Sequence, residues 1–316
     1  MAMREIQIYY GSLLRKFPRQ YISAVFCALV FSFLPIREAG AAQDCGKGLE
    51  LRLSAPISTQ GSLLLAGVRS AMPLAHVKGE WDSREVTFWK EDQRGEVWRA
   101  LVGIDLEKPA GEYPLKITAQ KQDGDPLECA ASVTVKEGRF PTENLHVENQ
   151  FVEPDPEQVK RAEEEGQRLR EIFDRVTPER LWHGRFRIPL DGVSTGGNFG
   201  RRRILNGQPH SPHSGVDFPA PTGTPVHAAQ RGRVVLAEPL FFSGNTVVVD
   251  HGLGIYTFYG HLSAISVKVG DIVDSGVVLG KVGATGRVTG PHLHWGLTVN
   301  KARVNGLQIV RLLGGK

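Results

Sequence analysis

Short valine-rich segments separated by glycines fill residues 183–310, and this pattern constrains the fold more than any other feature of the sequence. Segments 234–236, 246–250, 256–259 and 277–279 favour strands, because β-branched and aromatic side chains suit a pleated sheet. No apolar repeat with a helical period is visible there. We therefore expect an antiparallel β-sheet domain over residues 183–316.

The preceding part of the chain predicts a second β domain and a helix. Alternating apolar residues and turn signals between residues 49 and 137 favour a small antiparallel sandwich, and we assign residues 42–137 to an immunoglobulin-like accessory domain. Asp155, Pro156 and Gln158 suit the N-cap, N1 and N3 positions of a helix over residues 153–176. Residues 138–182 are thus predicted to be a helical linker, and the whole chain to be mainly β.

The N-terminus has the features of an export signal. A basic start precedes an apolar run from Tyr21 to Ile36, and Ala39-Gly40-Ala41 follows as a cleavage site. The run is shorter than the ~20 residues of a membrane span, so residues 1–41 predict a signal peptide, with an uncleaved anchor as the alternative. In an oxidising compartment Cys45 and Cys129 would form a disulfide, unless both remain free buried thiols.

Eight of the ten histidines lie in residues 183–316, and three short motifs there contain residues suited to metal chemistry. His213 and Asp217 stand four apart, too far on a straight strand, but Pro212 and Gly215 permit a bend; alone, the motif also fits a polar turn. His292 and His294 would share one face of a strand. His261, at the end of a strand, is a weak signal by itself. Two histidines and a carboxylate that leave a position for water are typical of catalytic zinc.

Together these motifs resemble the lysostaphin/LytM-type zinc endopeptidases, which cut peptidoglycan. The resemblance covers residues 183–310 and rests on His213-x-Gly215-x-Asp217, Tyr259-Gly260-His261-Leu262-Ser263 and Gly290-Pro291-His292-Leu293-His294-Trp295. Asn198-Phe199-Gly200-Arg201, Gly223-Thr224-Pro225-Val226, Gly244-Asn245 and Gly283, Thr285, Gly286, Thr289 and Gly290 also fit.

The resemblance implies one zinc ion on His213, Asp217 and His294. It implies that His292 is the general base and that His261 holds or protonates the tetrahedral species, whereas Tyr259 stays outside the catalytic set. Every key position is filled, which argues against the family's degenerate members that only activate other enzymes. His210, seven residues before Asp217, has the wrong spacing for a ligand. His183, His227 and His251 are interpreted as structural or surface residues.

Three other functions share features with this sequence. An iron(II) oxygenase uses a His-x-Asp/Glu pair, whereas His213 and Asp217 are four apart. A biotinyl- or lipoyl-like carrier needs a lysine at a tight turn, and Asp274-Ser275 in the hairpin of residues 267–280 has none. A cell-wall binding or activator protein with little or no turnover remains the alternative to a peptidoglycan hydrolase.

The charge distribution bears on partners and location. Although the chain has a net charge of +4, residues 42–182 hold 19 basic and 26 acidic residues and residues 183–316 hold 14 and 6. A net positive charge taken alone would suggest an anionic partner such as nucleic acid, but this uneven distribution removes the support for that interpretation. A basic catalytic domain suits the carboxylate-rich stem peptides of peptidoglycan. We expect an exported protein, periplasmic or secreted, with membrane contact only through an uncleaved leader. The acidic N-terminal half could dock on the basic domain.

Overall fold

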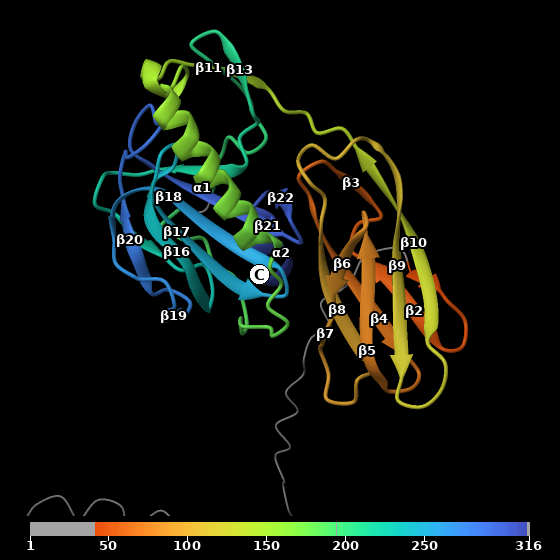
Figure 1. Cartoon of the computed structure of the whole chain (residues 1–316). Coiled ribbons are helices and arrows are strands. Elements are labelled where there is room, and N and C mark those ends of the chain that lie inside the picture. The colour runs from red at the N-terminus through yellow and green to blue at the C-terminus, as the bar shows by residue number, and fades with distance from the viewer. Residues whose placement is uncertain (1–41, 194, 315–316) are drawn as a thin grey trace, which may run out of the picture. The chain divides into compact units, whose positions relative to one another are not determined.

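The computed structural model describes residues 42–193 and 195–314 and is mainly β, as predicted (Figure 1). The predicted leader, residues 1–41, lies outside the described residues. Among the residues that are described, no helix is long and apolar enough to cross a membrane.

Two five-stranded sheets form a sandwich in the N-terminal part. The first contains, in spatial order, β1 (Ala42–Asp44), β2 (Leu49–Leu53), β4 (Leu63–Ser70), β8 (Val97–Gly103) and β7 (Trp89–Lys90). The second contains β3 (Ile57–Thr59), β10 (Leu127–Lys136), β9 (Gly111–Lys121), β5 (Leu74–Trp81) and β6 (Arg84–Thr87). Alternate residues such as Leu51 from one sheet and Ile117 from the other fill a single apolar core. All pairings are antiparallel except β3 with β10. The immunoglobulin-like topology stays a prediction.

Cys45 and Cys129 form a disulfide in this sandwich, with Cα atoms 5.5 Å apart. The bridge joins the turn after β1 to β10 across a sequence separation of 84 residues. A cross-link of this length restricts the unfolded chain strongly, so the structure supports the oxidised alternative of the two that the sequence left open.

We expect the double variant Cys45→Ser/Cys129→Ser to lose about 2–5 kcal/mol of unfolding free energy, because the unfolded chain regains the entropy of the open loop. Chemical denaturation with and without reductant measures this. Reductant should lower the stability of the wild type to that of the double variant and leave the double variant unchanged. Equal stability of the oxidised wild type and the double variant would contradict the expectation.

A helix, α1 (Pro156–Asp174), follows the sandwich and begins where the sequence predicts. Asp155 and Gln158 form a reciprocal capping box, and Pro156 occupies the first turn. Leu169 and Phe173 pack on the sheet face formed by β16 (Gly232–Leu240), β17 (Gly244–Gly252) and β18 (Ile255–Ile265), which Figure 1 shows beneath the helix. The short elements near it are β11 (Thr142–Leu145), a 3₁₀ turn (Asn149–Phe151), β12 (Arg202–Leu205) and β13 (Gln208–His210).

The C-terminal part is built on a nine-stranded antiparallel sheet. Its main path is β14 (Gly215–Pro219), β21 (His292–Val299), β18 (Ile255–Ile265), β17 (Gly244–Gly252), β16 (Gly232–Leu240) and β19 (Ile272–Val273). The remaining strands are β15 (Pro225–His227), β20 (Val278–Val282) and β22 (Ala302–Val304). Val247 of β17, Tyr259 of β18 and Trp295 of β21 are fully buried in one apolar cluster, and this packing stabilises the three central strands.

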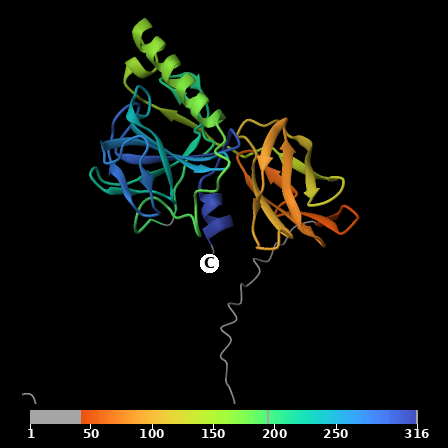
Figure 2. The ribbon, with the colours of Figure 1, turned by 60° about the horizontal axis from the view of Figure 1, so that its bottom comes forward.

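One element of this part differs from the all-β expectation. Residues Leu307–Gly314 form a helix, α2, whose first turn is capped by the Asn305 side chain. Figure 2 shows α2 at the C-terminal end of the described chain. The side chain of Gln308 accepts a hydrogen bond from the backbone N–H of Leu63, so part of the support for this short helix comes from the sandwich.

The sandwich and the large sheet share contacts. Arg303 donates hydrogen bonds to both carboxylate oxygens of Asp105 and pairs with Glu107 at 2.7 Å. Leu63 and Trp89 of the sandwich belong to the same buried apolar cluster as the core of the large sheet. That the acidic N-terminal half docks on the basic domain through its charge stays a prediction.

Candidate metal centre

The register of three neighbouring strands brings the candidate residues together. Asp217 on β14 lies directly opposite His294 on β21, and His294 lies opposite Gly260 on β18. His292 and His294 are two apart on β21 and therefore share a face, as the sequence predicts. His261 follows Gly260 within β18, in the interior of that strand and not at its end as expected.

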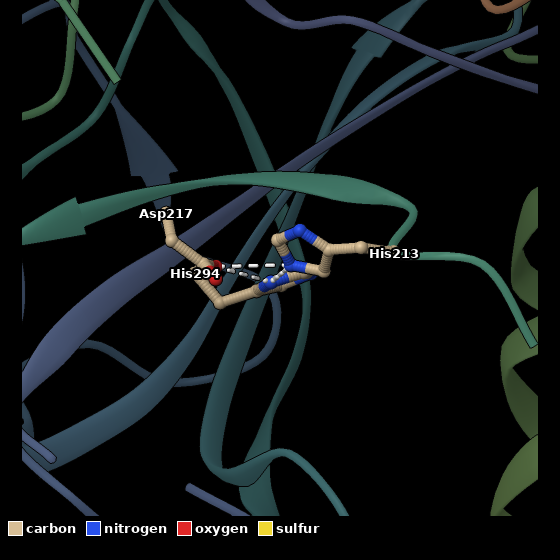
Figure 3. Close-up of side chains that lie close together, drawn as sticks. All are labelled: His213, Asp217 and His294. Atoms are coloured by element: carbon tan, nitrogen blue, oxygen red, sulfur yellow. Dashed lines mark hydrogen bonds and ion pairs between the residues drawn. The ribbon is translucent and has the colours of Figure 1, made fainter. Parts of the chain in front are cut away.

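Three side-chain atoms converge at one point (Figure 3). His213 Nε2 lies 2.8 Å from His294 Nδ1 and 3.0 Å from Asp217 Oδ1. His294 Nδ1 lies 3.0 Å from the same carboxylate oxygen. His213 and Asp217 are buried and His294 is partly buried. The expected His213, Asp217 and His294 set therefore has the proximity that a single ion requires.

Gly215 serves this cluster differently from the sequence-based expectation. Its φ is not positive, and it is the first residue of β14, so it is not a left-handed bend. A Cβ at position 215 would lie 2.5 Å from Cε1 and 2.6 Å from Nε2 of His294. Glycine is needed here because the imidazole of His294 packs against the backbone. His213 reaches Asp217 because it precedes the strand, where its N–H binds Arg201 O.

The protonation states of the clustered side chains favour a bound cation. His213 Nδ1 lies 2.9 Å from the carbonyl oxygen of Asn198, which can only accept, so the Nδ1 atom carries the proton. In neutral His213 the Nε2 atom then presents a lone pair toward the carboxylate oxygen of Asp217. Two facing lone pairs repel, and a cation between them converts repulsion into coordination. Imidazole nitrogens and a carboxylate are also suitable donors for such an ion, and the carbonyl that orients His213 is typical of metal-binding histidines.

Burial and neighbouring charges keep these groups in the ligand forms. Burial lowers the pKa of His213 to about 4, so the imidazole is neutral at pH 7. Burial alone would raise the pKa of Asp217, but the close contacts of its carboxylate with the rings of His213 and His294 outweigh burial and hold the pKa below its ordinary value. Neutral imidazole and ionised carboxylate are the protonation states that coordinate metals.

His261 and His292 lie beside the cluster. Their ring centroids are 4.8 Å apart, and His292 Nε2 is 3.7 Å from Asp217 Oδ1. His261 Nδ1 donates to Thr285 O at 2.8 Å and His292 Nδ1 donates to Gly290 O at 2.8 Å. Each neutral ring therefore has Nε2 as its unprotonated nitrogen. Burial, together with the nearby imidazoles, lowers the pKa of His261 to about 3.

Close backbone approaches hold His261 in place. Its φ is +63°, a left-handed conformation that costs a non-glycine residue about 1–2 kcal/mol. The backbone N–H of His261 donates to Ser243 O, and Thr285 Oγ1 donates to Leu262 O. A Cβ on Gly286 would lie 2.4 Å from Gly244 N, so glycine is required for the two segments to approach. Strained residues of this kind cluster at functional sites.

The other histidines and Tyr259 lie outside the cluster. His210, rejected as a ligand, is on β13. His227 pairs with Asp191, and buried His251 binds Arg231 O and Thr257 Oγ1. The Tyr259 hydroxyl is buried and accepts from Ala229 N–H, and burial raises its pKa to about 12.

Two arginines that sequence reasoning missed line the site. Arg203 Nη2 donates to Asp217 Oδ2 at 3.3 Å. Arg203 and Arg287 both border a cavity of about 610 Å³ containing His213, His261 and His294. They also border a smaller cavity of about 210 Å³ with Asp217 and His292. The available signal was an arginine within the run of glycines and threonines at 283–290.

Comparisons with known proteins match the part of the chain that contains these residues. The model of peptidase family M23 matches residues 211–306, which include the three clustered residues and both neighbouring histidines. A crystal structure of an M23 peptidase from Pseudomonas aeruginosa is 33% identical, with a TM-score of 0.61, and the match covers 80% of this chain and 94% of that one.

Curated relatives match over shorter parts of their length. Peptidoglycan DD-endopeptidase ShyA of Vibrio cholerae is 33% identical over 71% of this chain but 45% of its own length. DD-carboxypeptidase/endopeptidase Mpg of Neisseria meningitidis is 43% identical over 31% of this chain and 22% of its own length. The chain thus matches less than half of either relative. Its similarity to the Pseudomonas structure, over nearly all of that structure, shows that the chain belongs to peptidase family M23.

Proposed function

We propose that the protein is a zinc-dependent endopeptidase that hydrolyses peptide cross-links of bacterial peptidoglycan. The observation that carries the proposal is the convergence of His213 Nε2, Asp217 Oδ1 and His294 Nδ1 within 2.8–3.0 Å, beside two further imidazoles. Relatives named peptidoglycan DD-endopeptidase support the substrate class. One zinc ion is the cofactor we assign, since two histidines and a carboxylate are a common zinc set.

His213, Asp217 and His294 would hold the metal. A bound zinc ion supplies Lewis acidity that polarises the peptide carbonyl and acidifies a water molecule. His292 would accept a proton from the attacking water through Nε2, because Gly290 O fixes its other nitrogen as the protonated one. His261 is oriented in the same way by Thr285 O and would exchange protons with the reacting groups, including the leaving amine.

Export and domain organisation belong to the same proposal. We infer a leader over residues 1–41, an accessory sandwich over 42–137, a helical linker over 138–182 and a catalytic domain over 183–316. The Cys45–Cys129 disulfide supports an oxidising location such as the periplasm. There, the D-alanyl–diaminopimelate bond is the cross-link we expect to be cut.

Digestion of defined cross-linked muropeptides tests the proposed function. We expect the wild type to release monomers with new D-alanyl carboxyl and diaminopimelyl amino termini, identified by mass spectrometry. A chelator should stop the release by removing the ion, and stoichiometric zinc should restore it. Binding to intact peptidoglycan with no released peptide in zinc would favour the non-catalytic alternative.

A further inference from the structure

The larger cavity, which contains His213, His261 and His294, is lined by several basic side chains. Most of these side chains form ion pairs with carboxylates of the chain. Its basic side chains are Arg170, Arg203, Arg287, Lys301 and Arg303. Ion pairs join Lys301 to Asp174 at 2.9 Å, Arg303 to Asp105 at 2.7 Å and Arg203 to Asp217 at 3.3 Å. Arg170 is exposed on α1. Arg287 is partly buried and has no carboxylate partner within residues 42–193 and 195–314.

The position of Arg287 is fixed by its surroundings, although its charge is not balanced. Its backbone N–H donates to Phe242 O at 2.8 Å, and its guanidinium lies 4.5 Å from the centroid of the Phe242 ring. It is two residues after Thr285, whose carbonyl orients His261. Burial, together with the positive charge of Arg203, lowers the pKa of Arg287 to about 10. The guanidinium is therefore held in a place where an anion would stabilise it.

The chemistry of the substrate supplies such an anion. In a D-alanyl–diaminopimelate cross-link, the carbon that bears the scissile amide nitrogen also bears a free carboxylate. In a glycyl bridge the corresponding carbon bears no free carboxylate, because its carbonyl continues the peptide. A guanidinium can bind a carboxylate through two parallel hydrogen bonds, which favours arginine for this recognition.

We propose that Arg287 binds the free carboxylate next to the scissile amide and so selects diaminopimelate cross-links over uncharged ones. The inference rests on the proposed function. Arg287 borders both cavities that contain His261, so a carboxylate bound there lies within reach of the proton-transferring groups. Arg203 adds positive potential, but it also contacts Asp217 and is therefore unsuitable as a test position.

Two matched dimers test the selectivity: one with the free carboxylate at this carbon and one with a carboxamide. The wild type should cleave the free acid with the higher kcat/KM. Arg287→Gln should lower kcat/KM for the free acid about 10- to 100-fold, because a charge-assisted pair is lost, and should leave kcat/KM for the carboxamide nearly unchanged. For the free acid, kcat/KM of Arg287→Lys should lie between those of the wild type and Arg287→Gln. Arg202→Gln, an exposed neighbour of Arg203 outside both cavities, is the matched control and should behave as the wild type.

Metal content and folding are measured for each variant. An equal loss on both substrates, or an equal wild-type rate on both, would overturn the role of Arg287 and leave the endopeptidase proposal intact. Failure of the zinc-loaded wild type to cleave either dimer would overturn the proposed function, and the selectivity with it.

Discussion

Replacement of Asp217 by asparagine is expected to abolish metal binding and hydrolysis together while the fold is retained. The carboxylate supplies the only negative charge among the three converging ligands, and asparagine preserves its shape but not its charge. Bound zinc should fall from about one ion per chain to a small fraction, and kcat/KM by more than about 10³-fold, because the metal is needed for both carbonyl polarisation and water activation. Elemental analysis and muropeptide cleavage, with circular dichroism for the fold, measure the three properties.

His213→Ala and His294→Ala should give the same combined loss, since each removes one converging nitrogen. His210→Ala is the matched control, three residues from His213 but outside the cluster, and it should retain its zinc. Stoichiometric zinc in Asp217→Asn would show that the ligand assignment is wrong.

The family resemblance of the three motifs, together with their side-chain types, pointed to His213, Asp217 and His294, which the fold brings together, and their role as metal ligands stays a prediction. His292 and His294 share a face for any register of β21, and this much follows from their spacing. The supporting contacts could not be predicted in the same way. Asn198 and Thr285 act through backbone carbonyl oxygens, which every residue possesses. The role of Gly215 depends on the imidazole of His294, which lies on another strand and far away in the sequence, so no local pattern encodes that approach.

The fold shows the same division between local and tertiary signals. The capping box at Asp155 and Gln158 is local, and α1 begins where it predicts. Helix α2 spans only eight residues, which is too short for an apolar repeat to predict a helix from the sequence. Part of its support comes instead from the contact of Gln308 with the sandwich. Arg287 was missed for a related reason: it differs from the paired arginines of the cavity only in having no carboxylate partner among the residues that the structure describes.

The tautomers of the two neighbouring histidines revise the role expected for His261. A group that stabilises an oxyanion must present a donor. In neutral His261 the only N–H is used by Thr285 O, so Nε2 can accept a proton but cannot donate one. Burial keeps the ring neutral, with a pKa of about 3. The geometry thus favours His261 as a second proton acceptor beside His292. His261 can donate a proton through Nε2 only after that atom has gained one.

His292→Ala and His261→Ala should therefore each lower kcat/KM by about 10²- to 10⁴-fold while one zinc ion stays bound, because proton transfer is lost and the ligands remain. His261→Gln separates the two roles of His261. A glutamine amide can donate a hydrogen bond to an oxyanion but cannot take a proton at neutral pH, so we expect His261→Gln to be as slow as His261→Ala. Steady-state kinetics on a defined dimer, with zinc analysis of the same samples, gives the comparison. If His261→Gln keeps activity well above His261→Ala, His261 acts as a hydrogen-bond donor to the oxyanion; if His292→Ala loses its zinc, His292 helps to hold the metal.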